Sequence, residues 1–288
     1  MSNAQNTSPQ LVTWPYQAGQ LMHMAAYAGV FAATTYLIGT PLALGFAGVW
    51  AACDWYKHSN DGNGLAQKLA TRLYLDVTSQ DYQSLKGIVS DLSSKAHLKE
   101  APLVMVYKDD GYENIAVCGN PPVLMAYKPY LKILQPKEIF AVVGHELTHI
   151  AAGHLKWKRA ASIVANLAVN VASWRFGADI LSGHFSHSIG AGLLASAAML
   201  VNTAINISCT KLQENQADRG SVLLTREPQA LASGLQKLMA EKLGKNETET
   251  GNSVFRAMGA VNNYFMKSFH GNRPAKILQV ARQQHIPC

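Results

Sequence analysis

Charged residues are missing from the start of this 288-residue chain, where Asp54 is the first charge and Lys57 the first cation. This absence argues against a secretory signal peptide, which begins with a positive segment. Within the uncharged stretch, residues 21–38 and 41–52 are apolar. The stretch is long for one membrane span of about 20 residues and slightly short for two. We expect a tight helical hairpin in a membrane, with one long tilted span as the alternative.

Paired cysteines and long basic runs are also missing. Cys53, Cys118, Cys209 and Cys288 form no C-x-x-C pair, which argues against a disulfide framework and is consistent with reduced thiols on a cytoplasmic face. The formal net charge is +7, but basic and acidic residues are interspersed. We therefore expect no nucleic-acid partner, and attribute the positive charge to membrane topology and to anionic lipid nearby.

A second apolar region covers residues 160–174 and 189–209. The first of these segments carries Asn166 and Asn170, whereas the second has no charge at all. A short polar turn with Arg175 separates them. This pattern predicts a second membrane hairpin, and the alternative is a pair of buried helices in a soluble domain.

The five residues 145–149 read His-Glu-Leu-Thr-His. Positions four apart share one face of a helix, so His145 and His149 can bind one metal ion while Glu146 activates a water beside them. Such a short pattern also occurs by chance. Two features favour a metal site: the flanking residues are apolar, and Pro136 suits the first turn of a helix. A buried helix with these polar side chains and no metal would be costly.

A catalytic zinc ion needs a third protein ligand and one open position. His154 lies five residues after His149, about 140° round the helix, so we exclude it. Glu214 is the better candidate. Asp218 lies one turn later on the same face, where it could orient a ligand histidine through its second ring nitrogen. The alternative for both carboxylates is a solvated helix face, paired with nearby basic residues.

The remaining sequence predicts a mainly helical α+β domain with a small sheet. Short apolar segments predict strands, and apolar residues at helical spacing predict helices. The expected strands cover 102–107, 113–118 and 122–127, and the expected helices beside the metal-binding one cover 64–77, 79–96, 228–243, 254–269 and 274–284.

All Lys and Arg residues except Arg175 lie within 57–159 and 211–288. Both regions must share one side of the membrane if both contribute to one metal site, and the positive-inside tendency places them in the cytoplasm. The resulting organisation is an N-terminal membrane hairpin over 1–56, a first half of the catalytic domain over 57–159, a second hairpin over 160–210 and a second half over 211–288.

In the order of its segments and in two motifs, His-Glu-Leu-Thr-His and Glu214-Asn-Gln-Ala-Asp-Arg-Gly220, the chain resembles the HtpX-type membrane zinc endopeptidases, a family that includes the CAAX prenyl proteases. The resemblance implies a zincin-like fold with one zinc ion per chain. It implies that His145, His149 and Glu214 are ligands and that Glu146 is the general base. It also implies that Asp218 is a carboxylate that orients a ligand histidine through a hydrogen bond.

The resemblance extends to two weaker segments. Asn114 begins a strand similar to the family's Asn-Ala-Phe-Ala strand, although the aromatic residue is missing. The segment Ser268-Phe-His-Gly is similar to the family's Thr-His-Pro segment, so His270 is a candidate for contact with substrate, although Gly271 replaces the proline. These departures affect substrate binding more than metal chemistry.

The sequence thus predicts a multi-pass, integral membrane zinc endopeptidase, in a bacterial inner membrane, with its catalytic domain facing the cytoplasm. It would hydrolyse membrane or membrane-proximal polypeptides, as in protein quality control, and hold them along an edge strand near Val123–Tyr127. One alternative is a CAAX-type processing protease, for which the chain is short. The other is a catalytically silent membrane scaffold, against which the intact motif residues argue. The sequence predicts no oligomeric state.

Overall fold

The structure is a computed structural model. It describes residues 21–22, 25, 49, 52–53, 56, 79–107, 115–160, 185–246 and 272–287. The chain forms two compact units. The first contains the described residues 79–107, 115–152, 215–246 and 272–287, and the second contains 153–160, 185–214 and the isolated residues before 57. Most of the first expected hairpin, residues 161–184 of the second and His270 lie outside the described residues.

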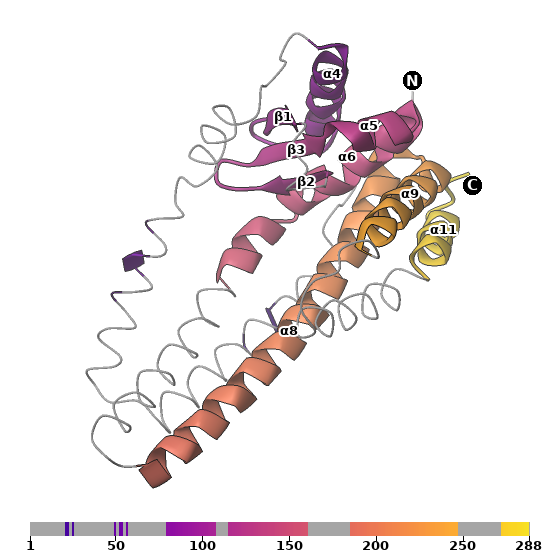
Figure 1. Ribbon diagram of the computed structural model, residues 1–288. Coiled ribbons are helices and arrows are strands. Elements are labelled where there is room, and N and C mark those ends of the chain that lie inside the picture. The colour runs from indigo at the N-terminus through magenta and orange to yellow at the C-terminus, as the bar shows by residue number, and fades with distance from the viewer. Residues whose placement is uncertain are drawn as a thin grey trace, which may run out of the picture. The chain divides into compact units, whose positions relative to one another are not determined.

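A three-stranded sheet forms part of the first unit (Figure 1). Its strands are β1 (Leu103–Tyr107), β2 (Ile115–Cys118) and β3 (Val123–Tyr127), in the spatial order β1-β3-β2. β1 is parallel to β3, and β2 is antiparallel to it. The three strands predicted from the apolar segments are confirmed, and so is the mainly helical α+β class with a small sheet.

The expected docking edge at Val123–Tyr127 is wrong, because β3 is the central strand and pairs on both sides. All five of its residues are buried. A continuous apolar run is typical of a strand that is covered on both faces, whereas alternation is typical of a half-exposed one. An extended substrate can therefore pair only with an outer strand of this sheet.

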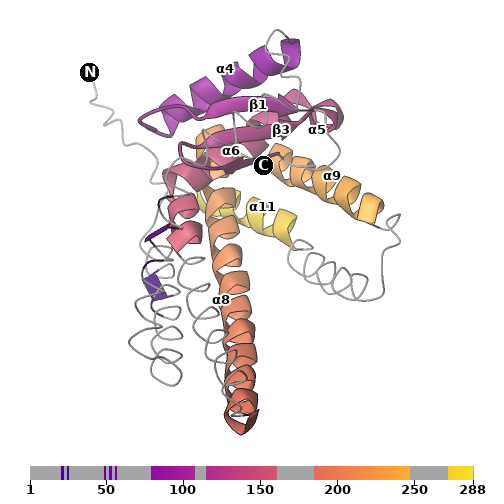
Figure 2. The ribbon, with the colours of Figure 1, turned by 60° about the vertical axis from the view of Figure 1, so that its left-hand side comes forward.

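Helix α4 (Gln80–Lys95) begins at Ser79, whose hydroxyl accepts a hydrogen bond from the Tyr82 backbone N–H at 3.2 Å. Such a bond satisfies one of the N–H groups that a helix start leaves without an intrahelical partner. Leu85, Val89 and Leu92 are buried on one face at helical spacing. This face contacts β1 and helix α6 (Pro136–Ala151), and Figure 2 shows α4 lying along the sheet.

Helix α6 (Pro136–Ala151), which contains the His-Glu-Leu-Thr-His motif, is fixed at its first turn by Glu138. The buried Glu138 carboxylate accepts hydrogen bonds from the Gln135 backbone N–H at 2.7 Å, from Ser233 at 2.6 Å and from Lys237 at 2.8 Å. Ser233 and Lys237 lie on α9 (Pro228–Asn246). Burial raises the pKa of Glu138, but these donors outweigh it and hold the pKa below its ordinary value.

The apolar core beneath the motif joins four helices: α6, α8 (Phe185–Thr225), α9 and α11 (Arg273–Gln283). Burial of these side chains stabilises the packing by roughly 25 cal/mol for each Å² of apolar surface removed from water. The helices predicted at 79–96, 228–243 and 274–284 correspond to α4, α9 and α11. The core consists of Ala141, Val222, Leu231, Ala232, Ile277, Ala281 and Ile286.

Helix α8 is continuous through the expected span at 189–209 and the segment with Glu214. Within the parts of the chain that the structure describes, no helix combines the length and the apolar character that crossing a membrane requires. The membrane hairpins and the four-part organisation of the chain stay predictions.

Candidate metal centre

Two helices, α6 and the last part of α8, cross at close range because each has a glycine at the crossing. A Cβ atom at Gly144 would lie 2.6 Å from Thr225 Cγ2, and one at Gly220 would overlap Thr148. The Ser221 hydroxyl donates a hydrogen bond to the Ala141 carbonyl at 2.6 Å, which links the helices directly. The crossing brings the segment with Glu214 and Asp218 to the histidine motif.

His145, His149 and Glu214 form a group in which one ligand atom from each residue lies within 4.8 Å of the others. The two histidines are 3% and 6% exposed, so water does not surround them. Their Nε2 atoms are 3.2 Å apart. Two nitrogens bound tetrahedrally to zinc at about 2.0–2.1 Å would lie roughly 3.3 Å apart, so this spacing fits the ion.

His154 lies outside this group among the described residues, which agrees with its exclusion on helical geometry. It is fully buried, at 0% exposure.

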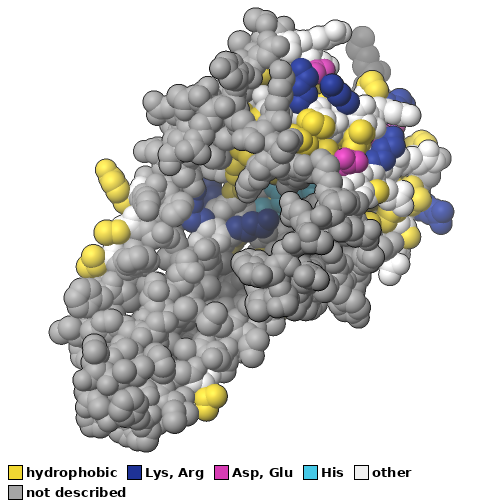
Figure 3. Space-filling model, in the orientation of Figure 1, with side chains coloured by type: hydrophobic (Ala, Val, Ile, Leu, Met, Phe, Trp, Pro, Cys, Tyr) yellow, Lys and Arg dark blue, Asp and Glu magenta, His cyan; other side chains and the backbone are white. Residues whose placement is uncertain are grey.

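Histidine side chains are visible from outside beside Lys and Arg side chains in the space-filling view (Figure 3). Two imidazoles and one carboxylate are the ligand set that zinc accepts in peptidases.

Asp218 contacts the second ring nitrogen of a histidine in this group. The distance from His145 Nδ1 to Asp218 Oδ1 is 2.9 Å. If Nδ1–H donates a hydrogen bond to this carboxylate, Nε2 carries the lone pair that a metal ion needs. Asp218 is 5% exposed, so the solvated helix face considered as an alternative does not apply to it.

Arg273, the first residue of α11, is the cation that pairs with Asp218, and the sequence did not indicate it. Its Nε and Nη2 each donate a hydrogen bond to one oxygen of Asp218, both at 2.7 Å. Burial raises the pKa of Asp218, but Arg273 and His145 outweigh it and hold the pKa below its ordinary value. The carboxylate is therefore ionised at neutral pH.

The guanidinium of Arg273 also borders the histidine ring itself. Its Nη2 lies 3.3 Å from His145 Nε2 and 3.5 Å from Nδ1, so it lies beside the ring rather than in line with one nitrogen. The sequence alone could not indicate that Arg273 pairs with Asp218, because the two residues lie 55 positions apart. The only hint was the position before Pro274, at the start of an expected helix.

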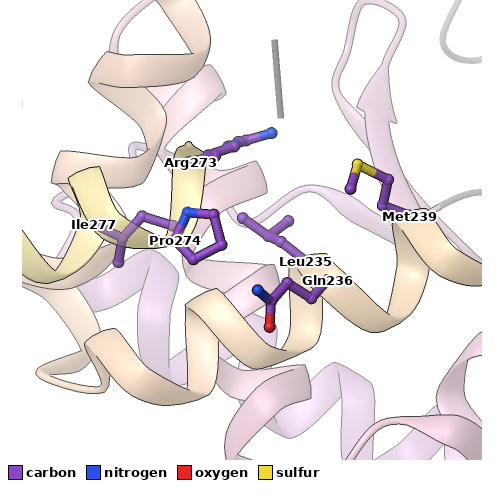
Figure 4. Close-up of a pocket in the computed structure, with 6 residues that line it drawn as sticks. All are labelled: Leu235, Gln236, Met239, Arg273, Pro274 and Ile277. Carbon is purple, nitrogen blue, oxygen red and sulfur yellow. The ribbon is translucent and has the colours of Figure 1, made fainter. Parts of the chain in front are cut away.

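Figure 4 shows that Arg273 also borders a small cavity between α9 and α11. The cavity has a volume of about 10 Å³, close to the space that one water molecule needs. It is therefore too small for an amino-acid side chain of a substrate. Its other lining residues are Leu235, Gln236, Met239, Pro274 and Ile277.

Glu146 is half-buried and lies next to His145 on α6, but its side chain reaches the sheet. Its Oε2 accepts a hydrogen bond from the backbone N–H of Val117 on β2, at 3.0 Å. A carboxylate beside two metal ligands is where a metallopeptidase places its general base. The structure thus brings together four of the predicted site residues, His145, His149, Glu214 and Asp218, and Glu146 follows His145 directly in the sequence.

Residues 79–276 match the family described as Peptidase family M48. The chain is similar to a protein named Protease HtpX homolog from Nostoc punctiforme, with 26% identity over 286 residues, 92% of this chain and 95% of the relative. A protein of the same name from Trichormus variabilis is 27% identical over 235 residues, 75% of this chain and 78% of the relative.

Another Protease HtpX homolog, from Methylibium petroleiphilum, is 27% identical over 179 residues, 60% of this chain and 63% of the relative. This match covers less than two thirds of that protein. No solved structure matches the chain. The described metal centre, with His145, His149 and Glu214, lies within the residues that match the family.

Proposed function

The chain belongs to peptidase family M48 and is a zinc metallopeptidase similar to HtpX, and on that premise we propose that it is a membrane-embedded endopeptidase with Glu146 as its general base. The observation that supports this most is the group of His145, His149 and Glu214, next to Glu146 in sequence. A scaffold without catalytic activity would need none of these residues.

The proposed reaction is hydrolysis of a peptide bond. A zinc ion held by His145, His149 and Glu214 would supply a Lewis acid, which would make water more acidic and polarise the scissile carbonyl. Glu146 accepts a proton from the attacking water and returns it to the leaving amine. Asp218 accepts a hydrogen bond from Nδ1–H of His145, which fixes the ring and its tautomer, and Arg273 keeps Asp218 ionised and in place.

The substrate in this proposal is an extended polypeptide that pairs with the outer side of β2. This strand is bonded to β3 on one side, and α6 contacts it. Its residue Val117 is hydrogen-bonded to Glu146, so a peptide along the strand would pass close to the proposed base. Main-chain pairing of this kind recognises extended segments with little regard to their sequence.

We place the enzyme in a bacterial inner membrane with the metal centre on the cytoplasmic side, where it would act on membrane or membrane-proximal proteins, as in quality control. The uncharged first 53 residues and the cation distribution support this location. The alternative is a CAAX-type processing protease with a narrow range of substrates.

The variant Glu146→Gln tests the proposed chemistry. It keeps the shape of the side chain but removes the base, so hydrolysis of an unfolded protein such as casein should fall roughly 100-fold or more. Zinc content should stay the same, because the three ligands are intact. Normal hydrolysis by this variant would contradict the proposed mechanism. A wild-type protein that binds zinc but hydrolyses no peptide bond would favour the catalytically silent scaffold.

A further inference from the structure

One hydrogen bond links the proposed general base to the sheet. Val117 on β2 donates its backbone N–H to Glu146 Oε2 at 3.0 Å, across 29 residues of sequence. Val117 itself is 8% exposed, and Glu146 is half-buried. A hydrogen bond to a charged oxygen in a partly buried position is stronger than one between neutral groups.

The strand pairing explains why this N–H is available to Glu146. Val117 is opposite Leu124 in the antiparallel pair of β2 and β3. In such a pair, residues that exchange hydrogen bonds with the neighbouring strand alternate with residues whose N–H and C=O point away from it. Since the Val117 N–H points to Glu146, Val117 belongs to the second kind. The hydrogen bonds between β2 and β3 therefore come from the flanking residues of β2, Ala116 and Cys118.

A general base must present its carboxylate within hydrogen-bond reach of the proton it removes. The last bond of a glutamate side chain rotates easily, with broad preferences. A donor fixed in a strand restricts that rotation, and the strand in turn is fixed by the pairing of β2 with β3. The position of the Glu146 carboxylate thus depends on the backbone of β2, not only on α6.

We propose that the Val117 amide is a positioning group for Glu146, so that one strand aligns both the substrate and the base. This inference rests on the proposed role of Glu146 as general base. A peptide that pairs with the outer side of β2 must leave the Val117 N–H to Glu146, and can use the outward carbonyl of Val117 instead. The amide contributes to the rate of the chemical step rather than to binding of substrate or zinc.

The first test measures hydrogen exchange of the Val117 amide, and it needs no catalysis. In full-length protein labelled with nitrogen-15 valine, the Val117 amide should exchange slowly even though it points away from β3. Glu146→Ala should speed its exchange by about tenfold or more, the effect of losing a hydrogen bond to a charged group. Val123 in the central strand is the internal reference and should not change. Equal exchange of Val117 in both proteins would overturn the proposal.

The second test replaces the amide by an ester, through incorporation of the α-hydroxy acid analogue of valine at position 117. This change removes the N–H and keeps the side chain. We expect kcat to fall about 10- to 100-fold, the equivalent of one hydrogen bond to a charged group, while KM and bound zinc stay constant. The simpler variant Val117→Pro also removes the N–H, at an edge where proline is tolerated, and Val117→Ala is its control.

An ester at Met125 is the matched control for the backbone change. Met125 is opposite Ala116, so its ester removes a bond of the β2–β3 ladder but keeps the Val117 N–H. It should lower stability and leave kcat near that of the wild type. Equal losses of kcat in both esters, or none at position 117, would contradict the positioning role. If the wild type binds zinc but cleaves no peptide, the proposed function fails first, and the role of Val117 fails with it.

Discussion

Two regions of the first unit bury a carboxylate against a cation, and they differ in what else the carboxylate contacts. Between α6 and α9, Glu138 binds Lys237, whose side chain is 38% exposed. At the metal centre, Asp218 binds Arg273, whose side chain is 8% exposed, and also contacts His145. The first pair links two helices to each other, whereas the second contacts a residue of the proposed zinc site.

The difference shows why one buried ion pair can matter for function and another only for folding. Both carboxylates have a lowered pKa despite burial, because their donors outweigh the loss of water. Lys237 can return to water when its partner is removed. Arg273 cannot, because its guanidinium is enclosed and bound at two points.

The largest effect is expected from Arg273→Ala, which leaves Asp218 as a buried charge without its cation. Loss of one partner from a buried pair typically costs about 3–5 kcal/mol of stability. The matched variant Lys237→Ala removes a partly exposed cation and leaves Glu138 two other donors, Ser233 and the Gln135 N–H, so it should cost less, about 1 kcal/mol. Urea unfolding of both purified proteins in detergent measures the difference. Similar losses would show that the two regions are equivalent.

A smaller effect is expected from Asp218→Asn, which keeps the size of the side chain but removes its charge. Loss of a carboxylate that is hydrogen-bonded to a ligand histidine typically lowers metal affinity or activity about 10- to 100-fold. Glu138→Gln makes the same chemical change in the other region and should leave zinc affinity unaltered. Zinc titration against a competing chelator separates the two variants. A nearly silent Asp218→Asn would remove the positioning role.

The smallest effect concerns the pH dependence that Glu138 contributes. Because its pKa is lowered on folding, its contribution to stability is present above the ordinary value of 4.5 and is lost as pH falls through the folded value. The difference in unfolding free energy between wild type and Glu138→Gln, about 1–2 kcal/mol at neutral pH, should therefore shrink in acid. Comparing the two proteins cancels the titration of the metal ligands. A difference that stays constant from neutral to acid pH would contradict this account.

Local patterns were enough to predict the three strands, the helices that correspond to α4, α6, α9 and α11, and the group of His145, His149 and Glu214, whereas the helices expected at 64–77 and 254–269 lie outside the described residues. The spacing of His145 and His149 depends only on helical geometry, and the run at Val123–Tyr127 depends only on local composition. Glu214 and Asp218 were predicted because a catalytic zinc ion needs a third protein ligand, and a ligand histidine usually has a hydrogen-bond partner such as a carboxylate. These features depend on residues within one turn or one strand, or on the chemistry of the ion.

The features that the sequence did not predict all depend on pairing between distant segments. Strand order decides that β3 is central and that β2 is an outer strand, and no local pattern encodes that order. Arg273 reaches Asp218 only because α11 packs on the core with Ile277 and Ala281. The Val117 bond to Glu146 comes from a backbone group, which has no signature in the sequence at all.

The central claim is that His145, His149 and Glu214 together bind one zinc ion. The most direct measurement is the zinc content of purified wild-type protein and of Glu214→Ala, by atomic emission after removal of loosely bound metal. The account predicts about one zinc per chain in the wild type and little or none in Glu214→Ala. Full retention of zinc by Glu214→Ala would contradict it.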